Sequence, residues 1–194
     1  MGYTSKSIKE IEIWLKENLT EEKYYHSLGT MKCAIGLAER FNLDTEKAQI
    51  AGLLHDCAKN FDKSKLIELV DKCNTEIFPR EISAPKVLHA PIGAYVAKEI
   101  FGVTDEEILS AIRFHTIARI NMSDFEKIIF IADKIETETR EKELHDKVTE
   151  LLDKENGLNS AMCFLLERTI KYLNTKQIKP DQSTIDICNW FMKK

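Results

Sequence analysis

The chain has 194 residues, of which 43% are hydrophobic and 31% are charged. This length and composition suffice for one globular domain with a hydrophobic core, and they argue against an intrinsically disordered chain. The formal net charge of −4 at pH 7 argues against the broad basic surface with which proteins bind nucleic acid. An anionic substrate would therefore need local positive charge, from a metal ion or from a few Lys and Arg side chains.

The five cysteines are odd in number and form no Cys-x-x-Cys pair, so neither a zinc finger nor a disulfide framework is indicated. Free thiols in a helix-rich chain fit a reducing compartment. The N-terminal residues lack the apolar segment of a signal peptide, and the apolar run Ile128–Ala132 is too short to span a bilayer. We therefore expect a cytoplasmic protein that does not bind a membrane.

Helix-starting residues, each followed by apolar residues at helical spacing, recur along the chain. The expected helices begin near Ile8, after a Thr20 cap, after an Asp44 cap and at Ser64. Residues 73–85, CNTEIFPREISAP, read as a loop because two prolines punctuate them.

Pro85 begins the next expected helix, which Gly102 ends in the usual C-terminal glycine position. Proline removes an amide donor and clashes with the preceding turn. Pro91 therefore predicts a kink or a break just after His89.

Two capping boxes, Thr104–Glu107 and Ser123–Glu126, start the following helices. Residues 141–194 predict two or three further amphipathic helices. No repeat, low-complexity segment or convincing linker interrupts this pattern. We expect an all-α fold in a single domain over residues 1–194, with a helical-bundle core at about 20–140 and additional C-terminal helices at about 141–194. An apolar stripe in this last part predicts core, or alternatively the face of a homodimer: Leu158, Met162, Leu165, Leu166 and Ile170.

Four histidines and two aspartates form an ordered series: His26, His55–Asp56, His89, His115 and Asp133. The intervals are 29, 33, 26 and 18 residues (55−26, 89−56, 115−89, 133−115). Each interval is one helix plus a connection, so each ligand can come from a different helix of a bundle. Asp133 also interrupts the apolar helix IIFIADKI, a costly place for an ionisable group unless it is paired or binds a metal. The conjunction predicts a shared metal site.

Single members of the series are compatible with simpler roles. One histidine alone is more typical of a hydrogen-bonded core or surface residue, and Asp133 alone would form a cap or a salt bridge. His145 is also followed by an aspartate, Asp146, but no apolar segment like AGLL precedes it. We therefore leave His145 out, because the dipeptide is weak evidence and the ordered series is strong.

The types of donor atom narrow the choice of metal and of the reaction that it supports. Imidazole and carboxylate suit Fe, Mn, Co or Zn, whereas an all-oxygen shell suits Mg or Ca. Adjacent residues on a helix point about 100° apart, so Asp56 can bridge two ions while His55 binds one of them. Two such ions activate a water and clamp the oxygens of a phosphoryl displacement. Lys59 follows on the same helix face and can neutralise a phosphate there, although such a lysine is usually solvated.

The order H…HD…D in a helical bundle resembles the HD-domain phosphohydrolases. Within that group, AGLLHDCAK, the isolated His89, ILSAIRFHT, NMSDFEKIIFIAD and the following KIE are similar to the YqeK-type family over roughly residues 20–180. Members of this family are described as symmetrical bis(5′-nucleosyl)-tetraphosphatases that favour iron. The resemblance implies a divalent metal cofactor, iron ahead of Mn, Co, Zn or Mg, with one or two ions bound.

The resemblance also implies roles for individual residues. His26, His55, Asp56 and Asp133 form the metal-binding core, and His89 and His115 serve a second ion or the phosphate. The expected catalytic residues are Asp56, Lys59, His89 and His115. The expected substrate contacts are Lys59, Asp62, Arg113, Thr116, Arg119 and Arg140, with Asp62 equally suited to be a helix cap.

The expected reaction is the symmetrical cleavage of diadenosine tetraphosphate to two ADP by metal-activated water. Two alternatives stay open: an HD-type nucleotidase or phosphodiesterase acting on other nucleotides, and a non-catalytic nucleotide-sensing module. The first depends on two departures from the family pattern, Ala118 in place of a glycine and Arg140 one residue late without the preceding proline. The intact ligand series argues against the second.

Overall fold

A computed structural model describes residues 2–73 and 75–193. These residues contain helices and no strand, so the expected all-α fold is confirmed. The elements are α1 (Ile8–Asn18), α2 (Glu21–Arg40), α3 (Thr45–Leu54), α4 (Lys63–Val70), α5 (Pro79–Ser83), the 3-10 helix η1 (Pro85–Val87), α6 (His89–Phe101), α7 (Glu106–Phe114), α8 (Asp124–Ile135), α9 (Lys142–Leu152), α10 (Gly157–Thr175) and α11 (Gln182–Met192).

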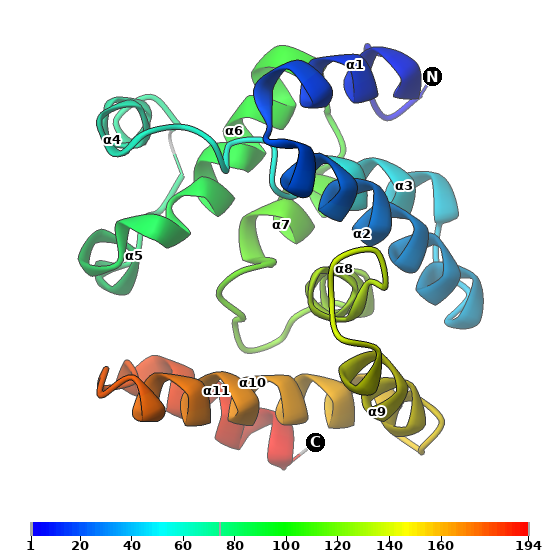
Figure 1. Cartoon of the computed structure of the whole chain (residues 1–194), viewed down its shortest axis with the longest axis vertical. Coiled ribbons are helices and arrows are strands. Elements are labelled where there is room, and N and C mark those ends of the chain that lie inside the picture. Colours follow the sequence, from blue (N-terminus) through cyan, green and yellow to red (C-terminus); the bar gives the residue numbers. More distant parts are fainter. Residues whose placement is uncertain (1, 74, 194) are drawn as a thin grey trace.

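Helix α8 lies at the centre of the molecule, where Figure 1 shows it nearly end-on. It packs against α2, α3 and α7 on one side and against α9 and α10 on the other. Nearly all of its side chains are buried, and its middle, residues 128–132, is apolar on every face. Asp133, in its last turn, is therefore carried into the interior between the two groups of helices.

Helices α2 and α3 cross in direct backbone contact at Gly52. A Cβ atom at this position would lie 2.8 Å from the Cα of Met31, closer than real Cβ atoms approach. Only glycine permits this crossing, which sets the position of the next turn of chain. That turn carries His55 and Asp56, directly after α3 ends at Leu54.

The helix starts agree with the sequence in most places. Thr20, Asp44 and Ser123 cap α2, α3 and α8 as predicted, the last in a complete capping box. Two other helices begin one residue away from the predicted place. Helix α4 begins at Lys63, not Ser64, and Asp62 caps it, which is one of the two roles predicted for Asp62. Its carboxylate accepts from the Lys65 amide at 2.8 Å and from the Ser64 hydroxyl at 2.6 Å. Asp105, not Thr104, caps α7.

The break that Pro91 predicted just after His89 lies instead just before His89. Helix α6 begins at His89, and η1 precedes it. Pro91 is thus the third residue of α6, where the amide would have no partner within the helix, so proline costs nothing there. The segment predicted as a loop also contains a short helix, α5, with Pro79 as its first residue.

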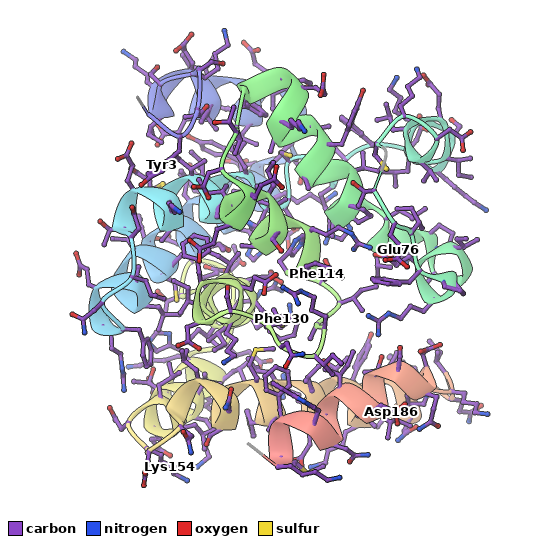
Figure 2. The ribbon with its side chains drawn as sticks, turned by 180° about the vertical axis from the view of Figure 1, so that it is seen from behind. Tyr3, Glu76, Phe114, Phe130, Lys154 and Asp186 are labelled. Atoms are coloured by element: carbon purple, nitrogen blue, oxygen red, sulfur yellow. The ribbon has the colours of Figure 1, made fainter. Side chains whose placement is uncertain are left out.

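The three C-terminal helices form a layer at one end of the molecule (Figure 1). Seen from behind, Figure 2 places Lys154, which follows α9, and Asp186 of α11 in this same layer. The apolar stripe of α10 faces the interior, with Leu158, Met162, Leu165 and Leu166 buried, as predicted for core. Among the residues described, none of the helices combines the length and the apolarity that crossing a membrane requires.

Candidate metal centre and adjoining cleft

The six residues of the ordered series meet at one buried place, which we call the His/Asp cluster: His26, His55, Asp56, His89, His115 and Asp133. His26 Nε2 lies 2.9 Å from Asp133 Oδ1 and 3.2 Å from His55 Nε2. These contacts join α2, the turn after α3 and the last turn of α8. The predicted convergence of ligands from different helices is therefore present in the structure.

Asp56 lies between the two halves of this cluster. Its Oδ1 is 3.0 Å from His89 Nε2 and 3.3 Å from His115 Nε2. Its Oδ2 is 3.6 Å from His55 Nε2 and 3.9 Å from His26 Nε2. One carboxylate oxygen thus faces each pair of histidines, the arrangement of a bridging ligand.

Hydrogen bonds at Nδ1 fix the orientation of all four imidazoles. In three of them, Nδ1 lies near the carbonyl oxygen three residues earlier: 2.8 Å for His55 and Gly52, 2.6 Å for His89 and Lys86, and 2.7 Å for His115 and Ile112. His26 Nδ1 lies 3.0 Å from the carboxylate of Glu136. Because these oxygens only accept, Nδ1 carries a proton in each ring, which leaves Nε2 as the ring nitrogen that faces the cluster.

This arrangement fits a bound cation. The Nε2 atoms of His89 and His115 lie 3.2 Å apart, as do those of His26 and His55. A cation coordinated by both nitrogens of a pair would account for so close an approach of two ring nitrogens. Two groups of donors, His26–His55–Asp56 and Asp56–His89–His115, each have their ligand atoms within 4.8 Å of one another. Nitrogen and carboxylate donors of this kind suit a divalent transition metal.

The electrostatics of the cluster keep His55, His115, Asp56 and Asp133 in the metal-binding protonation state. Burial lowers the pKa of His55 to about 3 and also lowers the pKa of His115, so both rings are neutral. Burial alone would raise the pKa of Asp56 and Asp133, but nearby histidines and, for Asp133, the ammonium of Lys134 outweigh it. Both carboxylates therefore have a pKa well below the ordinary value and are ionised at neutral pH.

His26 differs from the other histidines because two carboxylates flank its ring. Burial alone would lower its pKa, but hydrogen bonds with Asp133 and Glu136 outweigh burial and raise the pKa above its ordinary value. A proton on His26 therefore takes the place of positive charge that a metal would supply.

A cleft of about 770 Å³ opens beside the cluster. Asp133 and Lys134 at the end of α8 form one edge, and α10 forms the opposite wall. The cleft is lined by Asp133, Lys134, Thr139, Arg140, Glu141, Leu144, Phe164, Leu165, Glu167, Arg168, Thr169, Lys171, Tyr172 and Thr175. It is large enough for a nucleotide, and it combines aromatic rings with four cationic side chains.

A family model described as "HD domain" matches residues 24–138, which contain the whole His/Asp cluster. This chain belongs to the HD-domain family.

Relatives of this HD-domain chain agree over nearly its full length. A Bacillus subtilis protein named "Bis(5'-nucleosyl)-tetraphosphatase, symmetrical" is 38% identical over 180 residues, which cover 92% of this chain and 94% of the relative. A Staphylococcus aureus protein of the same name is 34% identical, covering 95% and 94%. A crystal structure from Clostridium acetobutylicum, described as a predicted HD superfamily hydrolase involved in NAD metabolism, is 40% identical with a TM-score of 0.89, covering 97% of this chain and 98% of its own.

Three residues expected to contact substrate do lie at the His/Asp cluster. Lys59 Nζ is 2.9 Å from His89 Nε2 and 3.3 Å from Asp56 Oδ1. The Thr116 hydroxyl is 2.9 Å from His115 Nε2. Arg140 lines the cleft, so its shift by one residue from the family pattern has not removed it from the site.

Three others lie elsewhere and have structural partners. Asp62 caps α4, which is the alternative role predicted for it. Arg113 is buried in a bidentate ion pair with Glu81, at 2.6 and 2.7 Å. Arg119 pairs with the buried carboxylate of Glu126 at 2.8 Å. The prediction that these three residues contact substrate is not supported by their positions, because each of them already has a partner outside the cleft.

Glu136, the acidic residue of the KIE stretch, is a residue of the site to which the sequence analysis gave no role. It is fully buried and accepts hydrogen bonds from the amides of Glu138 and Thr139 as well as facing His26. Gly29 of α2 makes room for it, because a Cβ there would clash with a Glu136 carboxylate oxygen. The available signal was an acidic residue three positions after Asp133, at the end of an apolar helix.

Replacing Glu136 with glutamine should weaken metal binding by about ten- to a hundredfold, the usual effect of removing an outer-shell partner of a histidine ligand. The amide keeps the size but loses the charge, and its NH2 group faces the donors of Glu138 and Thr139. Competition with a chelator measures the affinity. The matched control is Glu138→Gln, which removes an exposed ion pair with Lys32. Equal affinity in the Glu136 and Glu138 variants would rule out this role.

Proposed function

We propose that this chain is a divalent-metal-dependent hydrolase that splits bis(5′-nucleosyl) tetraphosphates symmetrically, diadenosine tetraphosphate giving two ADP. The observation that carries the proposal is the convergence of four imidazole Nε2 atoms and two carboxylates at the edge of a cationic, aromatic cleft. Relatives of this name cover 92% and 95% of the chain. We further propose that residues 1–194 act as one catalytic unit in the cytoplasm, alone or as a homodimer.

We propose two metal positions that share Asp56, one with His26, His55 and Asp133 and one with His89 and His115. Iron is the favoured metal, since imidazole with carboxylate suits iron better than it suits magnesium. A bound divalent ion supplies a water of lowered pKa and neutralises charge on the phosphate. The chain's contribution is to hold the imidazoles by their Nδ1 hydrogen bonds, so that little reorganisation is needed on loading.

The phosphates would lie along a line of donors at the edge of the cluster. Lys59, Thr116, Lys134 and Arg140 each have a polar atom within 3.4 Å of a cluster atom. Lys59 and Arg140 are partly exposed, at 36% and 44% of their side chains, so both can also reach a bound anion. Three of the four are cations, which gives the chain local positive charge despite its net charge of −4.

The far part of the cleft would hold a nucleoside. Phe164 and Tyr172 provide ring faces on α10, and Arg168 and Lys171 provide charge beside them. Aromatic faces accept any base by stacking, which fits a substrate recognised mainly through its polyphosphate. A small nucleotide fits this cleft, and the net charge argues against nucleic acid as the partner.

The test is a product assay in labelled water. Anaerobically purified protein, loaded in turn with Fe, Mn, Co, Zn or Mg, is incubated with diadenosine tetraphosphate in H2-18O. Symmetrical attack gives ADP alone, and each turnover places one 18O atom in one of the two ADP molecules. ATP plus AMP would defeat the symmetrical reaction. Faster turnover of mononucleotides or cyclic nucleotides would favour the nucleotidase or phosphodiesterase alternative.

Tyr172→Ala should raise KM by about tenfold and leave kcat nearly unchanged, because base stacking contributes about 1–3 kcal/mol and acts equally on substrate and transition state. Tyr172 is 58% exposed beside the cleft. Steady-state kinetics with the metal-loaded enzyme measures both constants. Tyr25→Ala is the control, since Tyr25 is 48% exposed on α2 and does not line the cleft. An unchanged KM in the Tyr172 variant would place the nucleoside elsewhere.

A further inference from the structure

A second group of side chains of metal-ligand type lies away from the His/Asp cluster, where α10 meets α11. Cys163 and Glu167 are one turn apart on α10, and Cys188 faces them from α11. Their ligand atoms lie within 4.8 Å of one another, and Cys163 Sγ is 3.9 Å from a Glu167 carboxylate oxygen. Figure 2 locates the place approximately, because Asp186 on α11 is two residues before Cys188.

We propose that Cys163, Glu167 and Cys188 form a second site, for a thiophilic divalent cation such as zinc. Zinc binds thiolate at about 2.3 Å and carboxylate at about 2.0–2.2 Å in a tetrahedron, which puts two sulfur ligands about 3.8 Å apart. Because the three ligand atoms already lie within 4.8 Å of one another, shifts of about 1 Å bring them to this spacing. Cys163 and Glu167 are only half-buried, so a water can fill the fourth position.

The donor set favours a metal over a disulfide or a purely apolar role for the two cysteines. A disulfide would make no use of Glu167, whereas a metal site uses its carboxylate as a third ligand. Burial and the neighbouring Cys188 raise the pKa of Cys163 to about 11, and burial also raises the pKa of Cys188. Thiols in this state react slowly with oxidants.

Binding of the cation releases two protons, one from each thiol. Each thiol loses one proton as its sulfur binds the cation, and Glu167 binds as the carboxylate. The site thus carries three negative charges around a divalent ion and links α11 to α10. Glu167 also lines the cleft, so the cation would fix the position of the cleft wall. The site itself does not depend on which nucleotide the cleft takes.

The first test uses the unmodified full-length protein. Metal-free protein is treated with a cysteine-alkylating reagent, with and without Zn²⁺, and the labelling rate of each cysteine is followed by mass spectrometry. Cys33 is the internal control, since it is half-buried like Cys163. Zn²⁺ should slow the labelling of Cys163 and Cys188 and leave Cys33 unchanged. Equal rates for Cys163 with and without Zn²⁺, or a Cys163–Cys188 disulfide in their place, would overturn the proposal.

The second test identifies the ligands by spectroscopy. Cd²⁺ added to the metal-free protein should produce a saturable thiolate-to-metal charge-transfer band. The His/Asp cluster cannot give this band, because it contains no cysteine. Cys163→Ser and Cys188→Ser should abolish the band, and Glu167→Gln should weaken Cd²⁺ binding by about tenfold or more. Cys33→Ser is the control and should keep the band. A band that survives both the Cys163 and the Cys188 substitutions would contradict the site.

Discussion

Asp56→Asn is expected to remove metal binding and to lower kcat/KM by about a thousandfold or more, since bound metal contributes several kcal/mol to such reactions. Asp56 is the one residue common to both groups of donors. Asparagine keeps the shape of the side chain but cannot place a negative charge between the two proposed metal positions. Metal content of the purified variant and steady-state kinetics measure the two effects, and circular dichroism checks that the helices are intact.

The chain offers a matched control for this substitution. Asp146 also follows a histidine, His145, but it is exposed on α9 and lies outside the cluster. Asp146→Asn changes the same dipeptide in the same way and should leave metal content and kcat/KM unchanged. If Asp56→Asn kept its metal and its turnover, neither the bridging position nor the proposed hydrolysis would stand.

The cluster could be predicted because its signal is spread along the chain in order. Ionisable residues at buried helix ends are costly unless they are paired or share a metal, and here they are spaced by one helix and a connection. The structure adds the reason for three of the histidines: each stands at the end or start of a helix and bonds to the carbonyl three residues earlier. Such a position orients Nε2 without help from distant parts of the chain.

The cleft could not be predicted in the same way. Its far wall is α10, and the sequence identified the buried face of that helix as core without indicating what its other face covers. Phe164 and Tyr172 line the same cleft as Arg140 because α9 and the connection after it bring α10 back against α8. Glu136 was missed for a related reason, since its partner His26 is 110 residues away.

The arginines show a second limit of prediction from sequence. The chemistry that suits a phosphate also suits a carboxylate of the protein, so the sequence cannot tell the two apart. Arg140 has an exposed side chain at the cleft, whereas Arg113 and Arg119 bind Glu81 and Glu126. The difference lies in which acidic residue the fold brings near each guanidinium.

Arg113→Met is expected to destabilise the fold by about 3–5 kcal/mol, because it leaves the buried carboxylate of Glu81 without its cationic partner. Glu81 is fully buried, and Arg113 also donates to the Glu76 carbonyl at 2.8 Å and lies over the rings of Phe78 and Phe114. For a chain of this size, Tm should fall on the order of 10 °C. Denaturant unfolding of the metal-free protein measures the free energy directly.

Two further variants separate this structural role from the substrate contact that the sequence predicted for Arg113. Adding Glu81→Leu to Arg113→Met removes the buried charge as well, so the double variant should recover much of the lost stability. Arg40→Met breaks an exposed ion pair with Asp153 and should cost less than about 1 kcal/mol. The folded Arg113→Met enzyme should keep its KM, because the guanidinium faces Glu81 and not the cleft. A raised KM at unchanged stability would return Arg113 to the substrate site.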